Sequence, residues 1–229
     1  MKILAIDTSS PMASIAILNG EELLLEISQL LDRSHSANII PIIQQSLKQV
    51  GMTLQEFDGY AVGIGPGSFT GIRVGIATIK GLAYATRKPV VGVSSLCALA
   101  YNGSNTCDSV AVLVDAKKNL VYFAWYRPRQ RGGLFEVIPP SLVSLKEALA
   151  KITRTTLFLG DIIQQYKSQI KRAKKKLARF AETTDHFPRA VWVGRLALEK
   201  FRQGKSQNLE SLTPQYLYSR YCSIKGIER

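Results

Sequence analysis

Short apolar runs separated by turn residues fill the first hundred positions of the chain, and longer runs with helical spacing lie between them. The strand-like runs occupy residues 2–6, 13–18, 22–27, 58–63 and 90–93. The helical patterns occupy residues 36–50, 71–86 and 94–101. The order β-β-β-α-β-α-β-α predicts a mixed five-stranded sheet flanked by helices.

A small polar stretch at residues 102–108 is expected to mark a domain boundary. Beyond it, strands are predicted at residues 110–114, 121–126, 135–138 and 156–159, and helices at 145–152, 161–174 and 189–203. Two β-β-β-α units in tandem are typical of the α/β fold shared by actin, sugar kinases and Hsp70 (ASKHA). We expect one such domain at residues 1–104 and a reduced copy at 105–229. The patterns leave open whether the last helix packs back on the first domain.

The segment Gly71–Ala85 has apolar residues on every side of a helix and carries only two charges, Arg73 and Lys80. A helix that is apolar all round must be covered all round. It is also rich in glycine, and each glycine inside a helix costs about 1 kcal/mol relative to alanine. Either the helix is buried within its own domain, or its own sheet covers one side and a partner covers the other.

Positive charge dominates this 229-residue chain, which has a formal net charge of +13. The densest cluster lies at residues 167–179, and nucleic-acid phosphate is the first partner to consider for it. The candidate contacts are Lys171, Lys174, Lys175 and Lys176. No aromatic residues interleave with them, so we expect no stacking of bases. The alternative is a solvated helix face.

The three cysteines, Cys97, Cys107 and Cys222, are far apart and form no CxxC pair, which favours a reducing compartment. The apolar stretch at the N-terminus is too short for a signal-peptide core, and no apolar run is long enough to cross a bilayer. We therefore expect a cytoplasmic protein with no membrane partner.

Two segments could hold phosphate. In the ASKHA fold the first hairpin does so, and here an acidic residue, Asp7, stands at its mouth beside Ser9 and Ser10. The glycine usual in that turn is missing, so Asp7 could equally cap its own hairpin. The second segment, with Gly65 and Gly67, precedes a helix but is not a Walker A sequence. It could present N–H groups to an anion or form a tight turn in which Gly67 supplies an unusual backbone angle. ATP or ADP at a weak site is the candidate ligand, and no cofactor is required.

The motif GIGPGSFTGIRVGIATIKGLAYA resembles the central motif of the TsaB (YeaZ) family of bacterial tRNA-modification proteins. LAIDTSS, HSANIIPII and PVVGVSSLCALA match at the expected places, and VLVDAKKNLVYFAWY and LTPQYL match more weakly. The resemblance is dense over the first 126 residues and thin beyond them. It implies the ASKHA fold.

A metal-binding HxxxH pair marks the catalytic paralogue, TsaD, and this chain lacks it. The matching positions are Ser95 and Leu99, and neither residue can replace an imidazole as a metal ligand. We predict no catalytic and no metal-binding residues. The resemblance implies a non-catalytic scaffold subunit of the complex that forms N6-threonylcarbamoyladenosine beside the anticodon of tRNA. A self-standing ATPase or kinase of the same fold is the first alternative, and a glycoprotease-like peptidase is the second.

The resemblance implies partners as well: TsaD in a heterodimer, the small ATPase TsaE through the complex, tRNA through the complex, and a homodimer when the chain is alone. Two helices with spare apolar faces make a natural half of a four-helix interface. The interface residues expected on them are His35, Ile39, Ile42, Ile43, Arg73, Val74, Gly75, Ala77, Thr78, Gly81 and Leu82.

Overall fold

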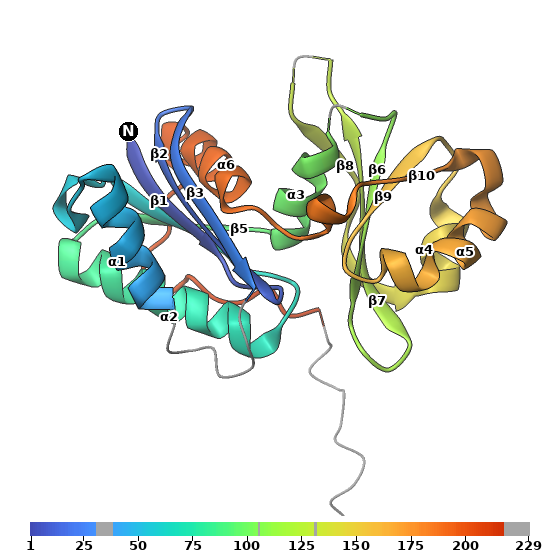
Figure 1. Ribbon diagram of the computed structural model, residues 1–229, viewed down its shortest axis with the longest axis horizontal. Coiled ribbons are helices and arrows are strands. Elements are labelled where there is room, and N and C mark those ends of the chain that lie inside the picture. Colours follow the sequence, from blue (N-terminus) through green and yellow to red (C-terminus); the bar gives the residue numbers. More distant parts are fainter. Residues whose placement is uncertain (31–38, 105, 131, 218–229) are drawn as a thin grey trace, which may run out of the picture.

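Two five-stranded mixed sheets, one in each lobe, organise the computed structural model (Figure 1). The structure describes residues 1–30, 39–104, 106–130 and 132–217. The strand order is β3-β2-β1-β4-β5 in the first sheet and β10-β9-β6-β7-β8 in the second. In each sheet an antiparallel three-stranded meander continues into parallel strands, so the predicted fold class is confirmed.

The first sheet lies between two layers of helices. Its strands are β1 (Lys2–Asp7), β2 (Met12–Asn19), β3 (Glu22–Leu30), β4 (Gly59–Gly63) and β5 (Val90–Val93). The helices of this lobe are α1 (Ile39–Val50), η2 (Leu54–Glu56), α2 (Phe69–Thr86), α3 (Ser95–Ala100) and η3 (Tyr101–Gly103). Helices α1 and α2 cover one face of the sheet (Figure 1).

The second lobe repeats this order in a smaller form. Its strands are β6 (Val110–Asp115), β7 (Leu120–Pro128), β8 (Leu134–Ser144), β9 (Thr156–Leu159) and β10 (Ala178–Phe180). Its helices are α4 (Leu145–Lys151), α5 (Ile163–Lys174), η4 (Lys175–Leu177) and η5 (Thr183–His186). Strand β8 is longer than predicted because Pro139 and Pro140 are tolerated at the edge of the sheet.

The last helix, α6 (Ala190–Arg202), returns to the first lobe and covers the other face of its sheet (Figure 1). A Cβ atom at Gly194 would stand 2.3 Å from Leu18 Cδ1, so this glycine lets the helix approach β2 closely. The segment after α6 also contacts the first lobe, since the amide of Gln207 donates to the carbonyl of Val90 in β5 at 2.9 Å. The predicted domain range 105–229 therefore does not describe α6 and residues 205–215, which pack on the first lobe, whereas the first sheet ends before residue 104 and the second begins after it.

The two lobes are tied together where the chain crosses between them. Asn102 Nδ2 donates to the carbonyl oxygens of Asp185 and Phe187, at 3.0 and 2.9 Å, and so links both crossovers. Helix α3 places Leu96 and Leu99 in a core shared with the second sheet.

Candidate functional site

The turn after β1 and the loop after β4 meet at one end of the first sheet. Strands β1, β4 and β5 run parallel, so their carboxyl ends lie at the same edge. Asp7 stands there fully buried. Its Oδ1 accepts hydrogen bonds from the amide of Ser9 at 2.8 Å and the hydroxyl of Ser9 at 2.6 Å. Its Oδ2 accepts one from Ser95 Oγ at 2.7 Å.

Burial raises the pKa of the Asp7 carboxyl above its ordinary value, and the hydrogen bonds from Ser9 and Ser95 only partly oppose that shift. The hydroxyl of Ser95 in turn accepts a hydrogen bond from the amide of Gly65 at 3.1 Å. Both carboxylate oxygens are thus bonded within the chain. The hairpin-capping alternative accounts for these contacts without a phosphate.

Glycines let the loop close directly over the turn. A Cβ at Gly67 would stand 2.3 Å from the carbonyl oxygen of Ser9, and one at Gly71 would stand 2.0 Å from that of Thr8. Gly67 is needed for this close approach and not for its backbone angle, because Gly65 is the loop glycine with a positive φ, 91°. The amide of Ser68 donates to the carbonyl of Ser9 at 2.7 Å.

The structure therefore brings the two candidate phosphate segments together, with Asp7 and Ser9 beside Gly65 and Gly67, and turns their polar groups toward one another. Ser10 is the exception, since its hydroxyl donates to the carbonyl of Met12 at 2.8 Å. Sequence reasoning missed Ser95 as a partner of Asp7. The sequence contained the information needed, because Ser95 closely follows the predicted strand β5. The carboxyl ends of β5 and β1 lie at the same edge of the sheet, which places Ser95 near Asp7.

The described part of the chain contains no group of three or more His, Cys, Asp or Glu side chains that could hold a metal ion. Ser95 hydrogen-bonds to Asp7, and Leu99 is fully buried among apolar neighbours. Within the same described ranges, no helix is long and apolar enough to cross a membrane.

The expected interface residues divide into two groups. Ile39, Ile42 and Ile43 pack in the core of the first lobe, and a Cβ at Gly75 would stand 2.3 Å from Thr8 Oγ1. The prediction is wrong for these four, because the helices turn them toward their own sheet. The others lie at the surface of α2: Arg73, Ala77 and Gly81 are exposed, and Val74, Thr78 and Leu82 are half-buried. His35 lies outside the described residues.

We call the exposed side of α2 that carries Ala77 and Gly81 the outward face of α2. It also carries Thr70, and the space around Gly81 is open, since a Cβ at this position would have nothing within 4 Å. Small exposed side chains let a second helix approach closely. The core of the first lobe accounts for the apolar residues on one side of α2. Cover of the outward face by a partner stays a prediction, and this face carries exposed Tyr84 as well as small residues.

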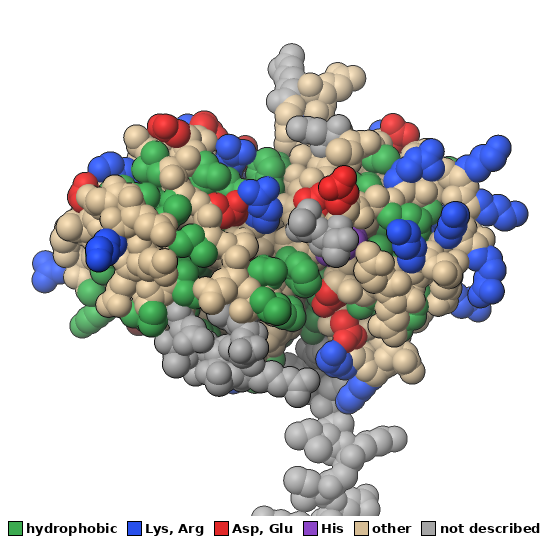
Figure 2. All heavy atoms as spheres, viewed as in Figure 1, with side chains coloured by type: hydrophobic (Ala, Val, Ile, Leu, Met, Phe, Trp, Pro, Cys, Tyr) green, Lys and Arg blue, Asp and Glu red, His purple; other side chains and the backbone are tan. Residues whose placement is uncertain are grey.

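Basic side chains gather over the helices of the second lobe (Figure 2). Helix α5 contains no acidic residue, and Lys171, Lys175 and Lys176 are exposed on it or just after it. Lys174 differs, since its Nζ donates to the carbonyl of Ile152 at 2.8 Å and so binds the end of α4. Lys174 is half-buried and partly engaged, so it is less available to a phosphate than the three exposed lysines, and its predicted phosphate contact stays a prediction.

Fold and site together define a two-lobed protein of the ASKHA fold in which the loop after β4 closes over the turn after β1. A model of the family described as TsaD, tRNA N6-adenosine threonylcarbamoyltransferase, matches residues 27–228. The tRNA threonylcarbamoyladenosine biosynthesis protein TsaB of Bacillus subtilis is 32% identical, with 100% of this chain and 99% of that protein covered. The chain belongs to the TsaB (YeaZ) family, within the wider TsaD family.

Other relatives agree with this placement. TsaB of Escherichia coli is 31% identical over 95% of this chain and 94% of its own length. The structure of YeaZ from Pseudomonas aeruginosa superposes with a TM-score of 0.80 at 26% identity, over 94% of this chain and 99% of that one. Component A of (R)-2-hydroxyglutaryl-CoA dehydratase from Acidaminococcus fermentans, at 10% identity and a TM-score of 0.51 over 87% of this chain and 98% of that one, shares the fold alone.

Proposed function

We propose that this chain is a non-catalytic subunit of the complex that forms N6-threonylcarbamoyladenosine in tRNA, and that it acts by binding TsaD. The observation that carries the proposal is the closed turn at Asp7. Asp7 is fully buried and both of its carboxylate oxygens already accept hydrogen bonds from Ser9 and Ser95, so the turn does not present a carboxylate to a metal-bridged phosphate. The names of the B. subtilis and E. coli relatives supply the pathway.

The outward face of α2 is the surface we propose for TsaD. Exposed Ala77 and Gly81 and half-buried Val74 and Thr78 give it the small, apolar character of close helix pairing. The contacts between the lobes, made by Asn102 and α3, support a scaffold role. A subunit with a fixed arrangement of its lobes can stabilise one conformation of a bound partner. TsaE would join through the complex, and a homodimer would use the same face when TsaD is absent.

We further propose that the protein acts in the cytoplasm, that it requires no cofactor, and that any ATP or ADP binds outside the Asp7 turn. The basic surface of α4 and α5 would lie against tRNA phosphates once the complex has formed. This surface is remote from α2 in the fold, so both contacts could be made at once (Figure 1).

Reconstitution tests the proposal. TsaD, TsaE, the enzyme that supplies threonylcarbamoyl adenylate, and tRNA should give modified tRNA only when this chain is added. The chain alone should give none, because we expect no activated nucleophile or metal at its site. Robust modification by the chain without TsaD, or equal modification by TsaD without the chain, would contradict the proposal. Saturable ATP hydrolysis by the isolated chain, abolished by Asp7→Ala, would favour an ATPase instead.

A further inference from the structure

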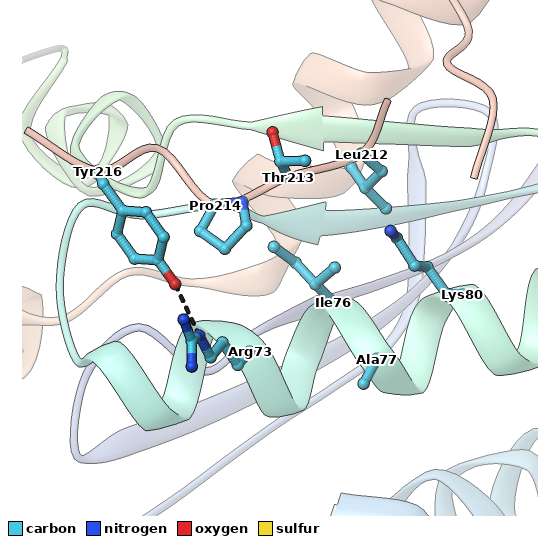
Figure 3. Close-up of a pocket in the computed structure, with 8 residues that line it drawn as sticks. All are labelled: Arg73, Ile76, Ala77, Lys80, Leu212, Thr213, Pro214 and Tyr216. Atoms are coloured by element: carbon cyan, nitrogen blue, oxygen red, sulfur yellow. Dashed lines mark hydrogen bonds between the residues drawn. The ribbon is translucent and has the colours of Figure 1, made fainter. Parts of the chain in front are cut away.

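A groove runs along α2, between this helix and the extended segment 205–217, which we call the C-terminal segment. Figure 3 shows its floor of Ile76, Leu212 and Pro214, with Arg73 and Lys80 reaching into it from α2. The hollow has a volume of about 740 Å³. A second hollow of about 480 Å³ follows further along the helix, beside Tyr84, Arg87 and Leu209.

Three cations follow one side of α2 at intervals of seven residues: Arg73, Lys80 and Arg87. Positions seven apart differ by almost two full turns, so they lie in a row with about 10 Å between neighbours. Arg87 caps the C-terminal end of the helix. The row therefore extends along nearly the whole of α2, next to the outward face.

The described structure does not balance these charges. The sequence has no Asp or Glu between Asp58 and Asp108. None of the ion pairs found among the described residues includes a member of the row. Glu210, which is exposed, is the single acidic residue of the C-terminal segment and takes part in none of those pairs. A surface of this kind is complementary to carboxylates or phosphates.

At the end of the groove that holds Arg73, the aromatic side chains favour a protein over a single strand of RNA, whereas Tyr84 beside the second hollow is 78% exposed. RNA would need free ring faces for stacking. The rings of Phe69 and Tyr216 already stack on each other, with centroids 5.5 Å apart, and the guanidinium of Arg73 lies 3.8 Å from the centre of the Phe69 ring. Arg73 Nε also donates to the hydroxyl of Tyr216 at 2.8 Å. The apolar floor of the groove, with cations on α2 beside it, is complementary to a protein segment that has aliphatic side chains next to carboxylates.

We propose that this groove selects the partner subunit: it receives a segment of TsaD that carries acidic side chains beside an apolar ridge. The inference rests on the proposed function, since it assumes that TsaD docks on α2. It explains how the chain prefers TsaD to a second copy of itself. A two-fold pairing uses the same surface on both subunits, so pairing through α2 would bring one row of cations against another. Like charges in such an interface oppose association.

The test compares two double variants with the same change in net charge. Lys80→Glu/Arg87→Glu reverses two members of the row, and Lys118→Glu/Arg127→Glu reverses two exposed cations of the second lobe that lie outside the basic surface of α4 and α5. None of the four side chains makes a hydrogen bond to another described residue, so both variants should fold, which circular dichroism checks. Binding of purified TsaD from the same organism is measured by surface plasmon resonance at low and high salt.

We expect the groove variant to lose at least about tenfold in affinity at low salt, mainly through slower association. The second-lobe variant should stay close to wild type, and high salt should narrow the difference between them. Equal binding by the groove variant and the wild type would overturn the inference. The inference would also be overturned if the groove variant lost tRNA binding but kept TsaD binding, because the groove would then bind RNA. A wild-type chain that does not bind TsaD at all would overturn the proposed function itself.

Discussion

Two glycines of α2 should respond in opposite ways to the same substitution. Gly75 faces the sheet and Gly81 faces outward, six residues further along one helix. Replacement by alanine improves helix propensity by about 1 kcal/mol at either position. At Gly81 no atom lies within 4 Å of the new methyl group, so we expect the full gain.

At Gly75 the new methyl group would stand 2.3 Å from Thr8 Oγ1. Thr8 cannot easily move aside, because it is buried and its hydroxyl donates to the carbonyl of Gly71 at 2.7 Å. Overpacking of this kind costs about 1–3 kcal/mol. After the gain in propensity is subtracted, Gly75→Ala should be neutral to destabilising by about 2 kcal/mol.

Thermal unfolding followed by circular dichroism measures the difference. For a chain of this size, 1 kcal/mol shifts Tm by roughly 2–4 °C. We expect Gly81→Ala to raise Tm by that amount and Gly75→Ala to lower it or leave it unchanged. If Gly75→Ala raises Tm as much as Gly81→Ala does, the close contact between α2 and the Asp7 turn is wrong, and with it the closed turn.

Three further predictions concern the partner face, the buried acid and the basic surface. Ala77→Glu should leave the fold intact, because Ala77 is exposed. It should weaken TsaD binding by roughly 3 kcal/mol, because the complex would bury an unpaired charge. Wild-type affinity in calorimetry would show that the interface does not include Ala77. Because the folded-state pKa of Asp7 is raised, the unfolded chain releases this proton first, so the contribution of Asp7 to the free energy of unfolding should fall as pH rises from about 4 toward that raised value. Asp7→Asn should remove this dependence in denaturant titrations, and an unchanged slope would contradict it. Lys171→Glu/Lys175→Glu/Lys176→Glu should weaken tRNA binding by the assembled complex at low salt and much less at high salt. Equal tRNA affinity of variant and wild type at low salt would make this surface a solvated face.

Local sequence patterns were sufficient where one element determines its own structure. The runs at residues 2–6, 13–18 and 58–63 became β1, β2 and β4, because their apolar content and turn residues act over a few positions. Orientation was harder to predict. Ile39, Ile42 and Ile43 were expected at a partner interface, yet they are buried in the core and Ile40 is exposed, because apolar residues on several sides of a helix do not show which side meets the sheet.

Long-range contacts account for the remaining differences. Helix α6 packs on the first sheet, against residues about 190 positions earlier in the chain. The sequence of the helix shows that it has an apolar side but does not show which of the two sheets this side packs against. The pairing of Ser95 with Asp7 depends on two strand ends meeting. Lys174 looked like the other lysines of its cluster, and only the position of the carbonyl of Ile152 sets it apart.

The return of α6 has a consequence for synthesis on the ribosome. When residue 104 has been made, all five strands of the first sheet exist, but the face that α6 will cover, with Ile3, Ala16 and Leu18, has no cover. About 100 more residues must be added before that helix is complete, which takes roughly 5–20 s at bacterial rates of elongation. During this time a finished sheet exposes an apolar surface, so the nascent chain should be a substrate for chaperones. A fragment that ends before residue 190 should be insoluble even though its sheet is complete.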